Sequence, residues 1–226
     1  MIKAILFDLD GTLIDTTDLI LRCFEHSWKQ VYGRVPPQAA VLSTFGIPLA
    51  EAMRQLLALT NEIRDEAAET EKGEPVIERL VAEYRFFNRG NHDRLARKFD
   101  RVNETLEELR DRDYRLGVVT SKGRELASRG LRLCSLDGLF DEAVFLEDTS
   151  RHKPHPDPIL MAMRRMERSA SETVYVGDSP IDIAAGWAAG VTTVGALWGP
   201  ISRSELEREK PDHLAESPAD LLALFR

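Results

Sequence analysis

The sequence has few cysteines, no excess of basic residues and no long hydrophobic run, and each absence narrows the possible functions. Cys23 and Cys134 are the only 2 cysteines in 226 residues, and they lack the spacing of metal ligands. This usage predicts a reduced, cytoplasmic protein in which both thiols pack as small apolar groups. Lys and Arg number 30 against 38 Asp and Glu, a formal net charge of −8, so nucleic acid is not an expected partner.

Hydrophobic stretches in the chain are short. All fall well below the ~18 consecutive apolar residues that span a membrane, so no membrane partner is expected. Residues 1–10 lack the apolar region and the cleavage site that a secretory signal would show. The chain is 43% hydrophobic and 30% charged, which is typical of a folded globular protein. A chain of this length buries about 70% of its unfolded surface and folds without disulfides or structural zinc.

Strand-like and helix-like segments alternate over most of the chain. This alternation predicts parallel βαβ units, and hence a doubly wound α/β sheet of five strands. The strands are expected at 2–8, 115–120, 142–147, 173–177 and 191–195. The intervening helices are expected at 102–112, 123–135, 156–168 and 180–189.

Residues 15–89 interrupt this alternation, because they lack strand signals. The spacing of apolar residues predicts helices at 16–32, 48–59 and 75–88, and the acidic run at 61–72 is expected as a solvated helix or loop. We therefore predict two domains, an α/β core of residues 1–14 and 90–226 and an inserted helical domain of residues 15–89. In such sheets, ligands bind beyond the carboxyl ends of the strands.

Carboxylates, hydroxyls and a lysine gather at the expected strand ends. The segments concerned are Asp8-Leu9-Asp10-Gly11-Thr12, Thr120-Ser121, Lys153 and Asp178 with Asp182. Converging carboxylates repel one another unless a cation holds them, and oxygen ligands without His or Cys suit Mg²⁺. The lysine indicates an anionic substrate, most simply a phosphate. Asp8 and Asp10 lie two residues apart on extended backbone, so one can attack a substrate while the other moves protons.

Taken in order, these segments resemble the haloacid dehalogenase superfamily of aspartate-nucleophile phosphotransferases. Its four motifs stand here as DLDGT at 8–12, VVTS at 118–121, KP at 153–154 and GDSPID at 177–182. The resemblance covers nearly the whole chain, including a helical cap inserted after the first motif. Further segments look most like phosphoglycolate phosphatases and the related inorganic pyrophosphatase branch, namely 45–49, 117–122, 152–154, 174–190 and 198–200.

The resemblance implies a role for each motif residue. Asp8 would be the nucleophile that forms an aspartyl-phosphate, and Asp10 would be the general acid and base. Asp178 would bind Mg²⁺ together with an Asp8 carboxylate oxygen and the Asp10 backbone carbonyl, and Asp182 would be a further ligand or hold the metal's waters. The transferring phosphoryl group would be bound by Leu9, Gly11, Thr120, Ser121 and Lys153. The implied protein is a Mg²⁺-dependent phosphatase that acts on a small phosphorylated metabolite, as a monomer or homodimer.

Three alternatives to this phosphatase remain open. An inorganic pyrophosphatase of the same branch and a β-phosphoglucomutase-like mutase would both share the core motifs. An inactive phosphate-binding protein or a phospho-switch would use a similar Mg²⁺ site. The presence of Asp10 favours phosphoryl transfer over dehalogenation. Specificity would depend on the helical domain, where Arg54 and Arg85 are candidates for binding a substrate carboxylate.

Overall fold

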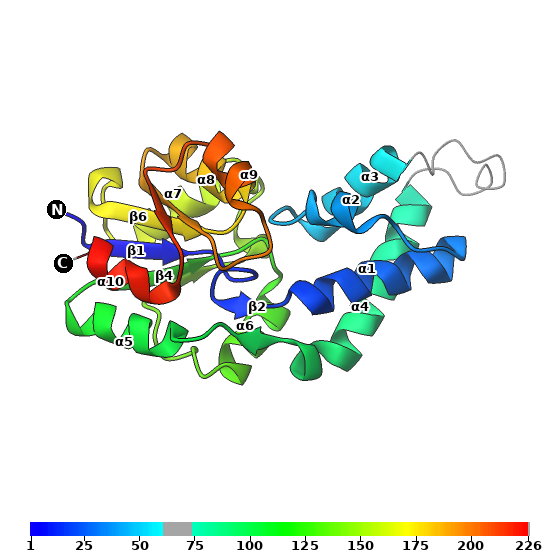
Figure 1. Cartoon of the computed structure of the whole chain (residues 1–226), viewed down its shortest axis with the longest axis horizontal. Coiled ribbons are helices and arrows are strands. Elements are labelled where there is room, and N and C mark those ends of the chain that lie inside the picture. Colours follow the sequence, from blue (N-terminus) through cyan, green and yellow to red (C-terminus); the bar gives the residue numbers. More distant parts are fainter. Residues whose placement is uncertain (61–73, 226) are drawn as a thin grey trace. The chain divides into compact units, whose positions relative to one another are not determined.

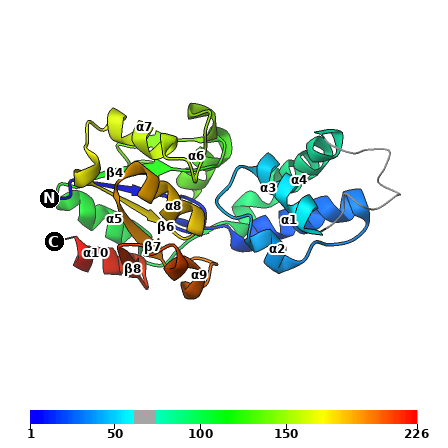
Figure 2. The same ribbon diagram turned by 90° about the horizontal axis from the view of Figure 1, so that it is seen from above.

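The computed structural model describes residues 1–60 and 74–225 (Figures 1 and 2). The acidic run at 61–72 lies outside these described residues. The chain forms two compact units, Met1–Asp15 with Arg97–Arg226, and Thr16–Ala96. The expected boundary between residues 89 and 90 falls inside helix α4 (Glu74–Leu95). The helix continues through Gly90 because a single interior glycine costs only about 1 kcal/mol.

A six-stranded parallel sheet forms the centre of the first unit, in the order β5-β4-β1-β6-β7-β8. Its strands are β1 (Ala4–Phe7), β4 (Arg115–Val119), β5 (Glu142–Val144), β6 (Thr173–Gly177), β7 (Thr192–Ala196) and β8 (His213–Ala215). The predicted α/β fold class is confirmed, but the prediction of five strands was wrong. The sixth strand, β8, escaped prediction because it is short and contains no β-branched residue.

Strands β1 and β6 are buried along their whole length, which explains their continuous apolar sequences. A second, two-stranded sheet pairs β2 (Ile14–Asp15) antiparallel with β3 (Arg97–Lys98). This pair stands where the chain leaves the first unit and where it returns.

Helices surround the sheet in the first unit (Figure 2). They are α5 (Val102–Asp111), α6 (Arg124–Leu133), α7 (Asp157–Arg165), α8 (Pro180–Ala189), α9 (Arg203–Arg208) and α10 (Leu221–Leu224). Ile159 of α7 and Ala185 of α8 belong to one buried cluster with Leu6 of β1 and Tyr175 of β6. Packing of these helices on the strands holds the loops at the carboxyl ends of the strands in place.

The second unit is entirely helical in the residues described. Its helices are α1 (Thr17–Tyr32), α2 (Gln38–Leu42), α3 (Leu49–Thr60) and α4. Phe24 and Trp28 of α1 meet Met53 of α3 and Leu80 of α4 in a core separate from that of the first unit. This confirms the helical character predicted for the insertion.

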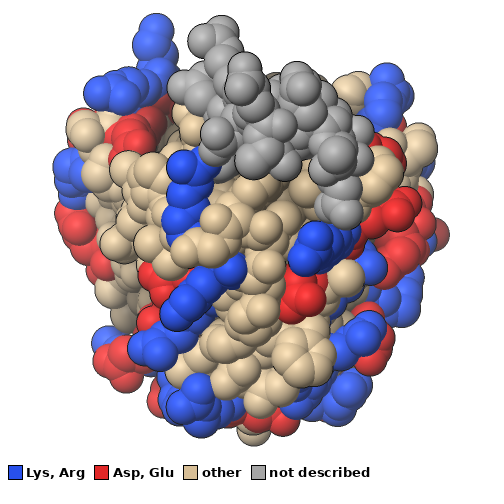
Figure 3. All heavy atoms as spheres, turned by 90° about the vertical axis from the view of Figure 1, so that its right-hand side faces the viewer, with Lys and Arg blue, Asp and Glu red and all other residues tan. Residues whose placement is uncertain are grey.

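Within the described chain, no helix combines the length and the apolar character needed to cross a membrane. On the face shown in Figure 3, basic and acidic side chains are interspersed and not gathered by sign.

Candidate active site

Asp8 lies at the carboxyl end of β1, between β4 and β6. Its backbone N–H donates to the Val176 carbonyl at 2.9 Å, and the residue is only 4% exposed. Phe7, the last residue of β1, pairs with Val118 of β4 on one side and with Val176 of β6 on the other. This register brings the segments that follow β4 and β6 to either side of Asp8.

The turn after Asp8 closes tightly against the segment that follows β6. Gly11 has a φ of +90°, and its N–H donates to the Ile14 carbonyl at 2.8 Å. A Cβ atom on Gly11 would lie 2.2 Å from Asp178 Oδ2, so only glycine fits there. The Leu9 side chain is buried, and its carbonyl accepts from Ile14 at 2.9 Å. Leu9 and Gly11 thus shape the turn, and their contact with a phosphoryl group stays a prediction.

Lys153 is a buried cation at the centre of the site. Its Nζ donates to Asp8 Oδ1 at 2.8 Å, to Asp182 Oδ1 at 2.7 Å and to the Tyr175 hydroxyl at 3.1 Å. Burial by itself would lower the pKa of Lys153, but the charges of Asp182 and Asp8 outweigh burial and hold the pKa well above its usual value. Lys153 therefore stays charged beside the two carboxylates.

Asp8, Asp178 and Asp182 form a cluster of buried carboxylates. Each offers an oxygen within 4.8 Å of those of the other two. Burial, reinforced by Asp182, raises the pKa of Asp8 to about 7 even though Lys153 opposes the rise. Burial also raises the pKa of Asp178 well above its usual value, with the charges of Asp182 and Asp8 adding to the effect. Three buried carboxylates repel one another when all of them are ionised. Their oxygens fit a divalent metal ion, which would offset this negative charge.

The capping of α8 places Asp182 in this cluster. The Ser179 hydroxyl accepts from the Asp182 backbone N–H at 3.3 Å, and the Asp182 carboxylate accepts from the Ser179 N–H at 3.1 Å. This reciprocal capping box, followed by Pro180 in the first turn, defines where the helix begins. The Asp182 side chain accordingly has one fixed direction, toward Lys153.

Thr120 and Ser121 follow β4, on the other side of Asp8. Thr120 is buried, and its N–H donates to the Val144 carbonyl at 3.0 Å. Its hydroxyl accepts from the Lys122 N–H at 3.1 Å. The N-cap of α6 is Gly123, so neither hydroxyl caps that helix. The predicted roles of Thr120 and Ser121 in substrate binding are not tested by these contacts.

The carboxylate of Asp10 is not part of the three-carboxylate cluster. It pairs instead with Lys122, whose Nζ lies 2.7 Å from Asp10 Oδ1. Sequence reasoning did not single out Lys122 as a functional residue. The signal that could have identified Lys122 is its position directly after the Thr120-Ser121 motif, at the carboxyl end of β4.

The loop after β7 packs on the same turn. Trp198 Nε1 donates to the Thr12 carbonyl at 2.8 Å. A Cβ atom on Gly199 would lie 2.4 Å from the Asp178 Cβ and 2.9 Å from the Gly11 carbonyl oxygen. This loop therefore supports the backbone on both sides of the carboxylate cluster.

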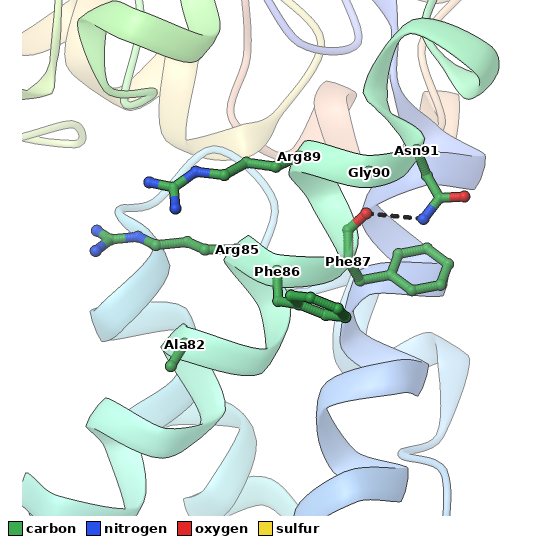
Figure 4. A pocket seen from close by; sticks show the side chains of 7 residues that line it. All are labelled: Ala82, Arg85, Phe86, Phe87, Arg89, Gly90 and Asn91. Carbon is green, nitrogen blue, oxygen red and sulfur yellow. Dashed lines mark hydrogen bonds between the residues drawn. The ribbon is translucent and has the colours of Figure 1, made fainter.

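The two arginine candidates of the second unit have different surroundings. The Arg54 guanidinium forms ion pairs with Glu74 at 2.7 Å and with Glu51 at 3.4 Å. Arg85 lines an open hollow of about 740 Å³ along α4, together with Phe86 and Arg89. Figure 4 shows the Arg85 and Arg89 side chains extending in the same direction from the helix. Of the two candidates, Arg85 is the better placed to meet an anion.

A family model for haloacid dehalogenase-like hydrolases matches residues 5–196 of the chain. The chain belongs to this family. The match includes every motif residue described above, and it confirms the predicted superfamily and hydrolase class. This hydrolase thus carries the motif order expected of its family on the expected fold.

Curated relatives resemble this hydrolase over nearly its full length. A protein named Pyrophosphatase PpaX from Bacillus mycoides (strain KBAB4) is 34% identical over 224 residues, which cover 99% of this chain and 97% of the relative. Pyrophosphatase PpaX from Anoxybacillus flavithermus (strain DSM 21510 / WK1) is 35% identical over the same length and coverage.

A solved structure agrees with the fold. The crystal structure of a predicted phosphoglycolate phosphatase from Haemophilus somnus 129PT superimposes with a TM-score of 0.88 at 27% identity, and covers 100% of this chain and 98% of that one. The names of these relatives agree with the phosphatase prediction and with its pyrophosphatase alternative.

Proposed function

We propose that this hydrolase is a Mg²⁺-dependent phosphatase that hydrolyses a small phosphomonoester through an aspartyl-phosphate on Asp8. The observation that carries the proposal is the position of Asp8. Its carboxylate is buried at a strand end, 2.8 Å from the Lys153 ammonium and within one cluster with Asp178 and Asp182. Such a carboxylate is shielded from water and faces a cation suited to a phosphoryl group.

The proposed reaction has two displacement steps. An Asp8 carboxylate oxygen attacks phosphorus, the bond from phosphorus to the leaving oxygen breaks, and Asp10 gives that oxygen a proton. Water then attacks the aspartyl-phosphate while Asp10 takes a proton from it. The bond between phosphorus and the Asp8 oxygen breaks, and inorganic phosphate leaves. Lys153, with Thr120, Ser121 and the turn at Leu9 and Gly11, would hold the phosphoryl oxygens through both steps.

Mg²⁺ is the metal we propose for the carboxylate cluster. Asp8, Asp178 and Asp182 supply hard oxygen donors, and the Asp10 backbone carbonyl is the further ligand expected from the family resemblance. When bound, the ion would offset negative charge on the phosphoryl group. We further propose that the helical unit Thr16–Ala96 acts as a cap that excludes bulk water during the reaction.

Phosphoglycolate is the substrate that we propose first. The name of the similar Haemophilus somnus structure supports it, and the set of motifs in the core is compatible with it. Pyrophosphate is the second candidate, which the names of relatives 34% and 35% identical support. Both compounds are small and carry two anionic groups. The cytoplasmic location and the choice between monomer and homodimer stay predictions.

Phosphate release from a panel of compounds tests the proposal. The panel contains phosphoglycolate, pyrophosphate, β-glucose 1-phosphate and p-nitrophenyl phosphate, each with and without Mg²⁺. We expect Mg²⁺-dependent release that disappears in Asp8→Asn and persists in Asp137→Asn, which changes an exposed carboxylate outside the site. Release that survives Asp8→Asn, or no release from any compound, would contradict the phosphatase. Isomerised sugar phosphate in the same tubes would support the mutase alternative.

A further inference from the structure

Lys122 is the second lysine of the candidate active site, after Lys153, and the proposed reaction gives it no role. Its Nζ lies 2.7 Å from Asp10 Oδ1, and the two side chains are 13% and 21% exposed. An ion pair this well covered is stronger than a pair on the open surface, because water screens it less. The contact also links two segments that are 112 residues apart in sequence.

The backbone of Lys122 is anchored on both sides. Its N–H donates to the Thr120 hydroxyl at 3.1 Å, and its carbonyl accepts from the Leu146 N–H at 3.1 Å. At the next residue, a Cβ atom on Gly123 would lie 2.9 Å from Glu147 Oε1, so the loop packs closely against its neighbour. The ammonium group therefore extends toward Asp10 from a fixed support.

Each of the two aspartates in the first motif is paired with a different lysine of the site. Lys153 is committed to Asp8 and Asp182, while Lys122 pairs with Asp10. The Asp10 carboxylate stands outside the cluster that fits a metal ion. The attraction of the Lys122 ammonium therefore acts on this carboxylate at a place outside that cluster.

We propose that Lys122 is a positioning residue that holds the Asp10 carboxylate in place for proton transfer. This inference rests on the proposed function, since it assumes that Asp10 serves the leaving oxygen and the attacking water. Lys122 itself would touch neither the phosphoryl group nor the leaving group. Its loss would therefore slow turnover and leave substrate affinity unchanged.

Kinetics of Lys122→Gln, Lys122→Arg, Asp10→Asn and the double variant Lys122→Gln/Asp10→Asn test this role, on the alkyl phosphate of the panel that turns over fastest. We expect Lys122→Gln to lower kcat roughly 10- to 100-fold, because a general acid and base contributes roughly 100-fold or more. The KM should stay within about twofold, and Lys122→Arg should restore most of kcat. In the Asp10→Asn background, Lys122→Gln should cost less than about twofold more.

Single-turnover release of p-nitrophenolate gives a second measurement that does not need a working Asp10 variant. This leaving group departs without a proton, so Lys122→Gln should release it within about twofold of the wild-type rate. Lys29→Gln, which changes an exposed lysine of α1, is the matched control and should behave as wild type throughout.

Other outcomes would overturn the inference. A raised KM with an additive double variant would make Lys122 a substrate ligand. Equal loss on p-nitrophenyl phosphate, or a large drop in melting temperature, would show a general effect on the site or the fold. A failure of the proposed function is separate from these results, because the wild type itself would then release no phosphate.

Discussion

The Thr12 hydroxyl donates a 2.7 Å hydrogen bond to Asp178 Oδ1, although 166 residues separate the two in sequence. Both residues are buried, and the bond joins the turn after β1 to the segment after β6. Asp178 is thus held by a neutral donor on one side while it faces two other carboxylates. Hydrogen bonds of this kind orient the ligands of a metal site.

We predict that Thr12→Val weakens Mg²⁺ binding about 10-fold, because it keeps the side-chain shape and removes the hydroxyl that orients Asp178. Isothermal titration with Mg²⁺ measures the effect directly. Thr12→Ser keeps a hydroxyl and is the matched control. Equal Mg²⁺ affinity for the valine variant and the wild type would show that Asp178 needs no such support.

Gly199→Ala is predicted to damage both stability and metal binding. The added methyl would lie 2.4 Å from the Asp178 Cβ, so the loop or the carboxylate must move. We expect a loss of about 1–3 kcal/mol in the free energy of unfolding, as is usual for overpacking. Gly138→Ala is the control, because a Cβ there meets nothing within 4 Å. Denaturant unfolding that shows equal losses for the two variants would refute the close packing.

The stability of the metal-free protein should fall as pH rises from about 4 to about 7. Burial raises the pKa of Asp8 from 3.8 to about 7, so the folded state binds a proton more tightly than the unfolded state. The resulting stabilisation is complete below pH 3.8 and is lost as pH rises through about 7. The raised pKa of Asp178 acts in the same direction.

Added Mg²⁺ should therefore stabilise the protein far more at pH 8 than at pH 5, since it binds the deprotonated carboxylates. Melting curves at both pH values, with and without the ion, measure this difference. Asp8→Asn should flatten the pH dependence of the metal-free protein. A Mg²⁺ effect that is the same at pH 5 and pH 8 would count against the buried carboxylate cluster as the binding site.

Tyr175→Phe should weaken the support of Lys153. The Tyr175 hydroxyl donates to the Val119 carbonyl at 3.1 Å and lies 3.1 Å from both Lys153 Nζ and Asp182 Oδ1. Its removal leaves buried partners unsatisfied, so we expect a loss of about 1–3 kcal/mol in the free energy of unfolding and a lower kcat. Tyr114→Phe, at a tyrosine that packs edge-on against Phe225, is the control. Urea unfolding and phosphate release are the two measurements.

Local sequence patterns were sufficient to predict the fold class and most of the strands and helices. Strand β1, with four buried apolar residues, and β6, with five buried residues, carry strong signals of their own. Strand β8 has only three residues and depends on pairing with β7 for its existence. The helix predicted at 75–88 extends as α4 past Gly90 to Leu95, because neighbouring turns outweigh one poor helix former.

The candidate site was predictable where the chemistry follows a motif, and less so where it depends on contacts between distant side chains. Asp8, Asp178 and Asp182 stand at strand ends or helix starts, and the parallel sheet brings them together. The pairing of Lys122 with Asp10 and that of Thr12 with Asp178 join residues far apart in sequence. The local periodicity of the sequence carries no information about such pairs. The ion pair between Arg54 and Glu74, 20 residues apart, was hidden for the same reason.

The pairing of β2 with β3 has a consequence for how this protein can change. Asp15 lies opposite Arg97, so the chain returns beside the point where it left. A two-residue turn joining these strands would complete an antiparallel hairpin and leave every hydrogen bond of the six-stranded sheet in place. We therefore expect that the segment between these residues can be exchanged for another insertion while the strand ends that carry the site keep their arrangement.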